Sequence, residues 1–136
     1  MTHSLAAAGQ QAWDALAQGD PGPAFEALSD EVVVDNGPGA LPWAHVEGKD
    51  ALATMMLEFV AQFQDDWKQV GRVVHADDEV VISVVHETGT ALSGDVFDNR
   101  AIWVSRYGQD GKVNRIWTVD LAHEALEEFW QRNPVT

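Results

Sequence analysis

Asp120 is the residue with the clearest potential for chemistry, a carboxylate that ends the segment 112–120 (KVNRIWTVD). Side chains alternate between the two faces of a strand, so Ile116, Thr118 and Asp120 share one face. If that face lines a pocket, burial would raise the pKa of Asp120 and suit it to act as a general base. The alternative is that Asp120 caps the next helix by accepting its free amide hydrogens.

His86 and Asn36 are the other two candidates for catalysis. His86 follows Val80, Ile82 and Val84 at every second position, which predicts a place at the polar end of a core-facing strand surface. An imidazole there could transfer a proton or orient a ligand, or it could be a structural histidine of the core. Asn36 could bind a carbonyl group or a water, or it could be a turn residue before a glycine.

A second group of residues could bind a ligand without taking part in the reaction. The chain has six tryptophans and five phenylalanines, which favours either a large apolar cavity or a well-filled core. Trp117 could line the cavity or face a partner subunit. The predicted ligand-binding residues, which combine aromatic walls with two polar side chains, are Trp13, Phe59, Asn99, Trp103 and Thr118.

Composition narrows the class of protein. The 136 residues predict a single domain over 1–136, and 46% hydrophobic residues predict a globular chain. A net charge of -14 argues against nucleic-acid binding, and no apolar run is long enough to cross a membrane. The absence of cysteine excludes disulfides and thiolate chemistry. Because no metal-ligand or cofactor motif is present, we expect neither a metal nor a cofactor, and a cytoplasmic protein without a secretion signal.

Helices come first along the chain and strands follow. Apolar spacing predicts helices over 4–18 and 23–28, a strand over 29–36, a loop over 37–48 and a long helix over 49–64. From residue 67 the apolar period changes to two, which predicts strands over 67–75, 79–90, 96–107 and 112–120. A short helix over 122–131 closes the chain.

This order predicts an α+β fold. The connections between the last four strands are short, which is typical of antiparallel hairpins. We expect a curved antiparallel sheet with helices packed on its concave face, a cone-shaped barrel with an open mouth.

Four segments resemble the SnoaL-like and ketosteroid-isomerase-like superfamily, whose cone fold is shared with nuclear transport factor two. They are 13–20 (WDALAQGD), 29–34 (SDEVVV), 46–52 (VEGKDAL) and 97–101 (FDNRA), the last followed by DGKV at 110–113. The resemblance covers nearly the whole chain. It implies the same fold, but it is compatible with isomerases, cyclases, dehydratases, epoxide hydrolases and non-enzymes.

The isomerase site does not carry over to this chain. The resemblance places the isomerase base at Asn36, which cannot accept a proton, with Asp35 one position away and so on the other strand face. The positions of the two oxyanion donors fall on Ala12 and Trp103, neither of which can replace them.

Two other family sites carry over in part. The Asp-Arg-Asp set of limonene-epoxide-hydrolase-like enzymes falls on Val84, His86 and Thr118, so that set is absent, although their water-holding asparagine matches Asn36. The aspartate that polyketide cyclases of the SnoaL type carry near the end of the last strand matches Asp120.

Two functions remain open at this point. The first is a small cofactor-independent enzyme that transfers protons on an apolar, carbonyl-bearing molecule in a cyclisation, isomerisation or dehydration, with Asp120 as base or acid and with His86 and Asn36 orienting the substrate. The second is a non-catalytic ligand-binding or assembly module on the same fold. A polar cluster deep in the cone would favour the enzyme, whereas a cone filled by aromatic side chains would favour the module.

The last two strands also predict how the protein assembles. They carry apolar residues on both faces, with Ala101 and Trp103 on one side of a strand and Ile102 and Val104 on the other. One face can serve the core of the cone. The second face needs cover, which predicts a homodimer through the outer face of the sheet.

Overall fold

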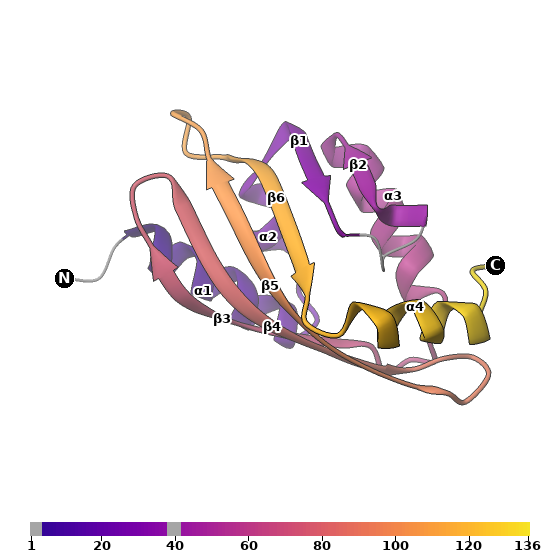
Figure 1. Ribbon diagram of the computed structural model, residues 1–136. Helices are drawn as coiled ribbons and strands as arrows, with labels where there is room; N and C mark the ends of the chain where they lie inside the picture. Colours follow the sequence, from indigo (N-terminus) through magenta and orange to yellow (C-terminus); the bar gives the residue numbers. More distant parts are fainter. Residues whose placement is uncertain (1–3, 38–41) are drawn as a thin grey trace.

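One curved sheet of six strands forms the frame of the molecule (Figure 1). The computed structural model describes residues 4–37 and 42–136. Across the sheet the strand order is β2-β1-β6-β5-β4-β3. The strands are β1 (Leu28–Asp35), β2 (His45–Glu47), β3 (Lys68–Ala76), β4 (Val80–Thr90), β5 (Val96–Tyr107) and β6 (Val113–Asp120).

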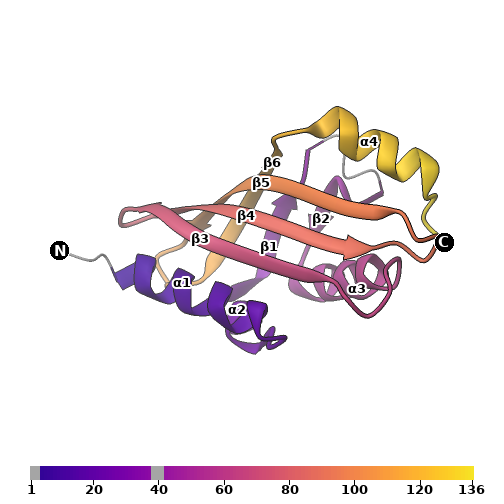
Figure 2. The same ribbon diagram turned by 90° about the horizontal axis from the view of Figure 1, so that it is seen from below.

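Four helices are described, and they lie at two ends of this sheet. Helix α1 (Ser4–Ala17) packs on β3 and is followed by the short α2 (Gly22–Glu26). Helix α3 (Lys49–Val60) packs against β1 and β2, and α4 (His123–Arg132) follows β6. Figure 2 shows α1 and α2 along one end of the sheet and α3 and α4 toward the other. No helix in the described ranges is long and apolar enough to cross a membrane.

The predicted α+β class and the antiparallel meander from β3 to β6 are confirmed. One pair of strands is parallel, β1 beside β6. The short strand β2 lies in what we predicted to be a loop, and it pairs with β1.

The longest helix ends earlier than predicted, at Val60 rather than residue 64. Beyond this helix the backbone bonds to the sheet, since Phe63 bridges to Ala91 and the Gln64 amide donates to the Thr90 carbonyl at 2.8 Å. After Val60 the chain therefore begins to form hydrogen bonds with the end of β4 instead of continuing the hydrogen bonds of the helix. The Phe63 side chain is buried.

The core has two parts, one aromatic and one aliphatic. The aromatic part joins α4 to the far end of the sheet and contains Trp43, Phe63, Ala91, Phe97, Leu126, Phe129 and Trp130. The aliphatic part joins α3 to β1 and β6 and contains Val32, Val34, Val46, Leu52, Val113 and Ile116. Met55 packs against both parts and is only partly buried, so the interior between them is incompletely filled.

Candidate functional site

A pocket opens between the concave face of the sheet, α3 and α4. Its alpha-helical wall comes from Met55, Met56 and Phe59 on α3 and from Leu126 and Trp130 on α4. It holds about 590 Å³ of empty space, part of which is open to solvent. The remaining lining residues combine aromatic rings with polar side chains: Asn36, Trp43, Trp67, Gln69, Glu87, Phe97, Asn99, Trp103, Thr118 and Asp120.

Asp120 lies at the pocket wall, on the strand face that it shares with Ile116 and Thr118. Its Oδ1 atom accepts a hydrogen bond of 3.0 Å from the Asn99 amide. Burial raises the pKa of Asp120, while the Asn99 hydrogen bond and the nearby His123 act in the opposite direction. Asp120 is not the N-cap of α4: that position is Ala122, and it makes no side-chain capping hydrogen bond.

Glu87 is a pocket carboxyl group that the sequence analysis missed. Its Oε1 atom accepts a hydrogen bond of 3.0 Å from Asn99, and its Oε2 atom accepts one of 2.8 Å from Gln69. Burial raises the pKa of Glu87 to about 7, and the neighbouring charge of Asp120 contributes to that rise. Glu87 can therefore gain and lose a proton near neutral pH.

His86 does not reach the pocket, so the predicted face of β4 was wrong. The buried residues of that strand are Val81, Ser83, Val85 and Gly89, and Glu87 lies on the same face. His86 points to the outer surface, where its Nε2 atom lies 2.8 Å from the Asp98 carboxylate. The error arose because the outer face of this strand is also apolar, so periodicity alone did not distinguish the two faces.

Two features could have exposed this error. Ser83 and Glu87 are polar residues on the strand face that also carries Val81 and Val85, and polar side chains among apolar ones on a single face are typical of a pocket wall. Gln69 is a similar case, a buried polar residue on β3 whose side chain faces Glu87.

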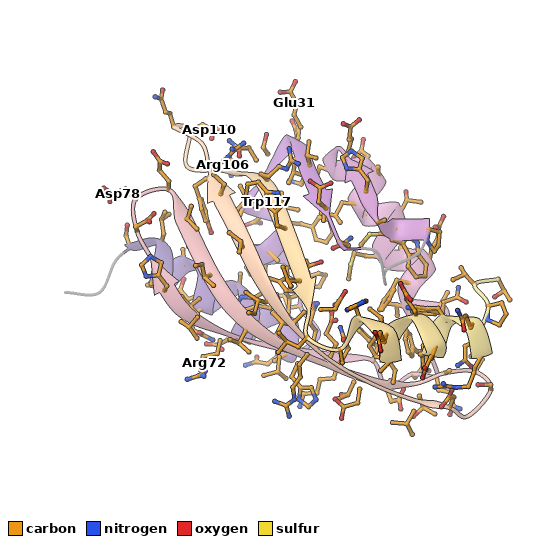
Figure 3. All side chains as sticks on the ribbon, viewed as in Figure 1. Glu31, Arg72, Asp78, Arg106, Asp110 and Trp117 are labelled. Carbon is orange, nitrogen blue, oxygen red and sulfur yellow. The ribbon has the colours of Figure 1, made fainter. Side chains whose placement is uncertain are left out.

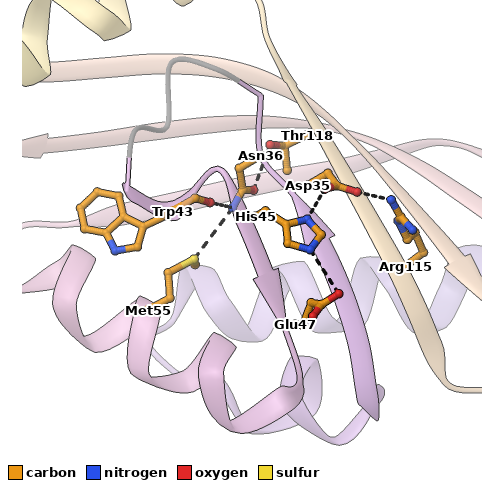
Figure 4. A network of polar contacts seen from close by, with 8 residues as sticks. All are labelled: Asp35, Asn36, Trp43, His45, Glu47, Met55, Arg115 and Thr118. Carbon is orange, nitrogen blue, oxygen red and sulfur yellow. Dashed lines mark hydrogen bonds and ion pairs between the residues drawn. The ribbon is translucent and has the colours of Figure 1, made fainter.

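Asn36 lies at the pocket with both ends of its amide held in place (Figure 4). Its Oδ1 atom accepts a hydrogen bond of 3.0 Å from the Thr118 hydroxyl, and its Nδ2 atom donates one of 2.9 Å to the Trp43 carbonyl. The Nδ2 atom also donates to the Met55 sulfur at 3.9 Å. These bonds orient the amide, and because a thioether sulfur is a weak acceptor, a ligand oxygen could take the place of the Met55 sulfur.

The neighbouring Asp35 points away from the pocket. It bonds to the Arg115 guanidinium, and its other oxygen lies 2.6 Å from Nδ1 of His45 (Figure 4). Nε2 of His45 in turn lies 3.3 Å from a Glu47 oxygen. The hydrogen bond from His45 is the largest cause of the lowered pKa of Asp35, and the Asp35 carboxylate likewise raises the pKa of His45. This cluster ties β1 to β2 and β6 and does not line the pocket.

Aromatic residues account for most of the apolar wall. Phe59 and Trp103 line the pocket, whereas Trp13 does not. Trp13 lies behind Trp103 in an edge-to-face contact with a centroid distance of 5.2 Å, and its indole N–H donates to Ser83. Trp13 therefore supports the wall from outside. Trp117 lies on the outer face of the sheet, beside Arg106 and Arg115 (Figure 3).

This site combines a carboxylate, a second carboxyl that titrates near neutrality and an oriented amide in an aromatic cavity. Such a set can move a proton and bind a polar group of an otherwise apolar molecule. Within residues 4–37 and 42–136, no group of three or more His, Cys, Asp or Glu side chains is arranged to hold a metal ion.

Comparisons with known proteins agree with this architecture. A family model described as a SnoaL-like domain matches residues 10–116. No curated protein matches the chain.

Several solved structures share the fold. An NTF2-like protein of unknown function from Burkholderia pseudomallei is 14% identical with a TM-score of 0.76, and the match covers 98% of this chain and 99% of that one. TerC, co-crystallised with polyporic acid, is 13% identical with a TM-score of 0.71 over 90% and 96% of the two chains. Rv0760c from Mycobacterium tuberculosis, in complex with estradiol-17β-hemisuccinate, is 13% identical with a TM-score of 0.63 over 82% and 89%.

Proposed function

The chain belongs to the SnoaL-like domain family, and we propose that it is an enzyme that uses its own side chains for proton transfer on an apolar, carbonyl-bearing small molecule. The observation that carries this proposal is the Asp120 carboxylate. It lies in an aromatic pocket, burial raises its pKa, and one of its oxygens is held by Asn99. A base of this kind needs an elevated proton affinity and a fixed orientation.

In the proposed reaction Asp120 removes a proton from the carbon next to a carbonyl group. The C–H bond breaks, its electron pair moves toward the carbonyl oxygen, and the proton goes to the Asp120 carboxylate. The N–H of Asn36 that faces the Met55 sulfur would donate to that oxygen instead as negative charge develops on it. Return of the proton to another carbon gives isomerisation, attack of the carbanion on a second carbonyl gives cyclisation, and loss of a leaving group gives dehydration.

The experiment measures proton exchange, so it needs no knowledge of the final product. A panel of apolar ketones is incubated with the protein in D2O, and loss of the α-proton signal is followed by NMR. We expect exchange above the buffer rate for part of the panel. Asp120→Asn should lower that rate roughly 10²-fold or more, the usual cost of losing a general base.

Asp98→Asn is the matched control for this experiment. It makes the same chemical change on the outer face of the sheet, where Asp98 faces His86. It should leave the exchange rate unchanged. If Asp120→Asn exchanges protons as fast as the unmodified protein, Asp120 is not the base.

A non-catalytic binding module remains the second candidate, and the aromatic pocket wall favours it. Four tryptophans line the pocket, Trp43, Trp67, Trp103 and Trp130, so ligand binding should quench the intrinsic fluorescence. Polyporic acid and estradiol-17β-hemisuccinate, which two proteins of the same fold hold, are suitable probes. Saturable quenching without any α-proton exchange would support the binding module against the enzyme.

We also propose that a second copy of the chain covers the outer face of the sheet. Ile102 and Val119 are paired across β5 and β6, as are Val104 and Trp117, and all four side chains point away from the pocket. Val119 is 56% exposed. An exposed apolar sheet surface can be buried by a two-fold contact with the same surface of a second copy.

A further inference from the structure

We propose that Glu87 and Asp120 form one acid–base unit, joined through Asn99, that holds a single proton between its two carboxyl groups at neutral pH. In this unit Asp120 contacts the ligand, and Glu87 is a positioning residue that controls the charge of Asp120. The inference deepens the proposed function and rests on it for the role of Asp120 as a base.

The sheet register places these groups in one polar row. Gln69 on β3 lies directly opposite Glu87 on β4, and Glu87 lies directly opposite Asn99 on β5. Asp120 extends the row at the end of β6, where its Cα partner is Ala101, two residues beyond Asn99. Side chains directly opposite each other on one face of a sheet are close enough to bond, so this row follows from the register.

Asn99 connects the two carboxyl groups. Its Nδ2 atom donates to Oε1 of Glu87 and to Oδ1 of Asp120, at 3.0 Å in each case. Both N–H groups of the amide are therefore used, and the two carboxyl oxygens lie within about 6 Å of each other. Only 6% of Asn99 is exposed, so water screens this pair weakly.

Two negative charges at this separation in an aromatic pocket repel each other, so the second ionisation is disfavoured. Burial and the Asp120 charge raise the pKa of Glu87 to about 7, whereas the bonds from Asn99 and Gln69 and the charge of His86 lower it. His123 is the charged group that favours the ionised form of Asp120. Glu87 is therefore the carboxyl group that retains the proton.

The hydrogen bonds also divide the roles. Both oxygens of Glu87 accept amide hydrogens, from Asn99 and Gln69. Within the described ranges, Oδ2 of Asp120 accepts no hydrogen bond and lies near Gly37 at the pocket wall. In the proposed unit this oxygen is the one that meets the ligand. When Asp120 takes a proton from a ligand its charge disappears, and Glu87 then loses its own proton more readily. The net charge of the pocket thus changes little during the transfer.

The test is an NMR titration of the ligand-free full chain, in which the side-chain carboxyl carbons of Glu87 and Asp120 are followed from about pH 4 to about pH 9. We expect a midpoint for Glu87 near pH 7, and a second, smaller shift of the Asp120 carbon at the same pH. Asp120→Asn should lower the Glu87 midpoint by roughly half a pH unit or more, because it removes the repelling charge.

Asp50→Asn, which removes an exposed carboxylate from the first turn of α3, away from His86, should leave the Glu87 midpoint unchanged. A Glu87 midpoint below about pH 5, near that of an ordinary glutamate, would overturn the proposal. Two midpoints that do not respond to each other would overturn it as well. The unmodified protein alone decides both points, so the test does not depend on the folding of a variant.

A second readout separates this inference from the proposed function. In the α-proton exchange assay, the rate should show an inflection near pH 7 that is absent in Glu87→Gln. Coupled midpoints without any exchange would reject the proposed enzyme and retain the carboxyl unit. Exchange with uncoupled midpoints would reject the unit and leave Asp120 as a single base.

Discussion

Glu87 links the chemistry of the pocket to the stability of the protein. The pKa of the Glu87 carboxyl group is about 7 in the folded state, against an ordinary value of 4.5. Between these two pH values the group therefore binds more protons when the protein is folded than when it is unfolded. The free energy of unfolding must therefore fall as the pH rises through this window. The pocket thus holds its second carboxyl group at a cost in stability above neutral pH.

Glu87→Gln should remove this pH dependence. At about pH 8 the variant should be more stable than the unmodified protein by up to roughly 3 kcal/mol, and near pH 4 the two should be equal. Chemical denaturation at several pH values measures the difference. The raised pKa of His45 adds a slope of the same sign above pH 6.5, but it is common to both proteins and cancels.

Glu128→Gln on the exposed side of α4 is the control, and it should follow the unmodified protein at every pH. If Glu87→Gln shows the same pH dependence as this control, the carboxyl group of Glu87 is ionised throughout and its proposed role fails.

At the scale of elements, the contact between α1 and β3 supports the pocket from behind. Trp13 of α1 lies over Gly71 of β3 and against Trp103, which is part of the pocket wall. A Cβ atom at Gly71 would overlap the Trp13 ring. The backbone of Gly71 does not have a positive φ, so its conformation does not require glycine. Glycine is needed at this position because the Trp13 ring approaches the strand so closely.

Gly71→Ala should therefore destabilise the protein by about 1–3 kcal/mol or more, since the rigid indole ring and the strand must separate. Urea denaturation measures the loss. Displacement of Trp13 should also weaken probe binding at Trp103, although neither Gly71 nor Trp13 lines the pocket.

Arg72→Ala gives a matched control on the same strand. Its side chain is exposed and projects away from the helices (Figure 3), and the substitution only shortens it to Cβ. We expect a change within about 0.5 kcal/mol. An equal loss in both variants would show that β3 responds to any alanine, and that the Trp13 contact has no special role.

At the scale of the whole molecule, the sheet separates two functions by face. Its concave face holds the polar row and the pocket, whereas its outer face is apolar around Ile102, Val104 and Val119. The chain carries a net charge of -14, which opposes association unless an apolar contact compensates for it. Assembly through the outer face would leave the pocket of each copy accessible.

Val119→Glu should convert the proposed dimer into a monomer, because it places a charge in the middle of the apolar surface. Light scattering after size-exclusion chromatography measures the mass. Leu57→Glu makes a similar change at a residue of α3 that is 76% exposed and lies away from this face, and it should remain dimeric. An unmodified chain that is monomeric at micromolar concentration would contradict the proposal.

Local pattern was sufficient for most of the helices and strands and for one side of the site. The change of apolar period after residue 67 marked the four meander strands, and alternation along β6 placed Thr118 and Asp120 on one face. These features depend on neighbours within one strand, whose geometry repeats every two residues. The residues Asn36, Phe59, Asn99 and Trp103 also lie at the pocket.

Other features required the tertiary structure. Both faces of β4 carry apolar side chains, so alternation along the strand did not show which face points into the pocket. His86 was therefore predicted at the pocket, where Glu87 lies instead. The short β2 becomes a strand only because β1 offers it a partner.

The row of Gln69, Glu87, Asn99 and Asp120 is created by the register between four strands. The sequence by itself determined which residues could do chemistry and how each strand alternates. Only the packing of strands against one another decided which of those residues meet, because hydrogen bonds between strands join positions that are far apart along the chain.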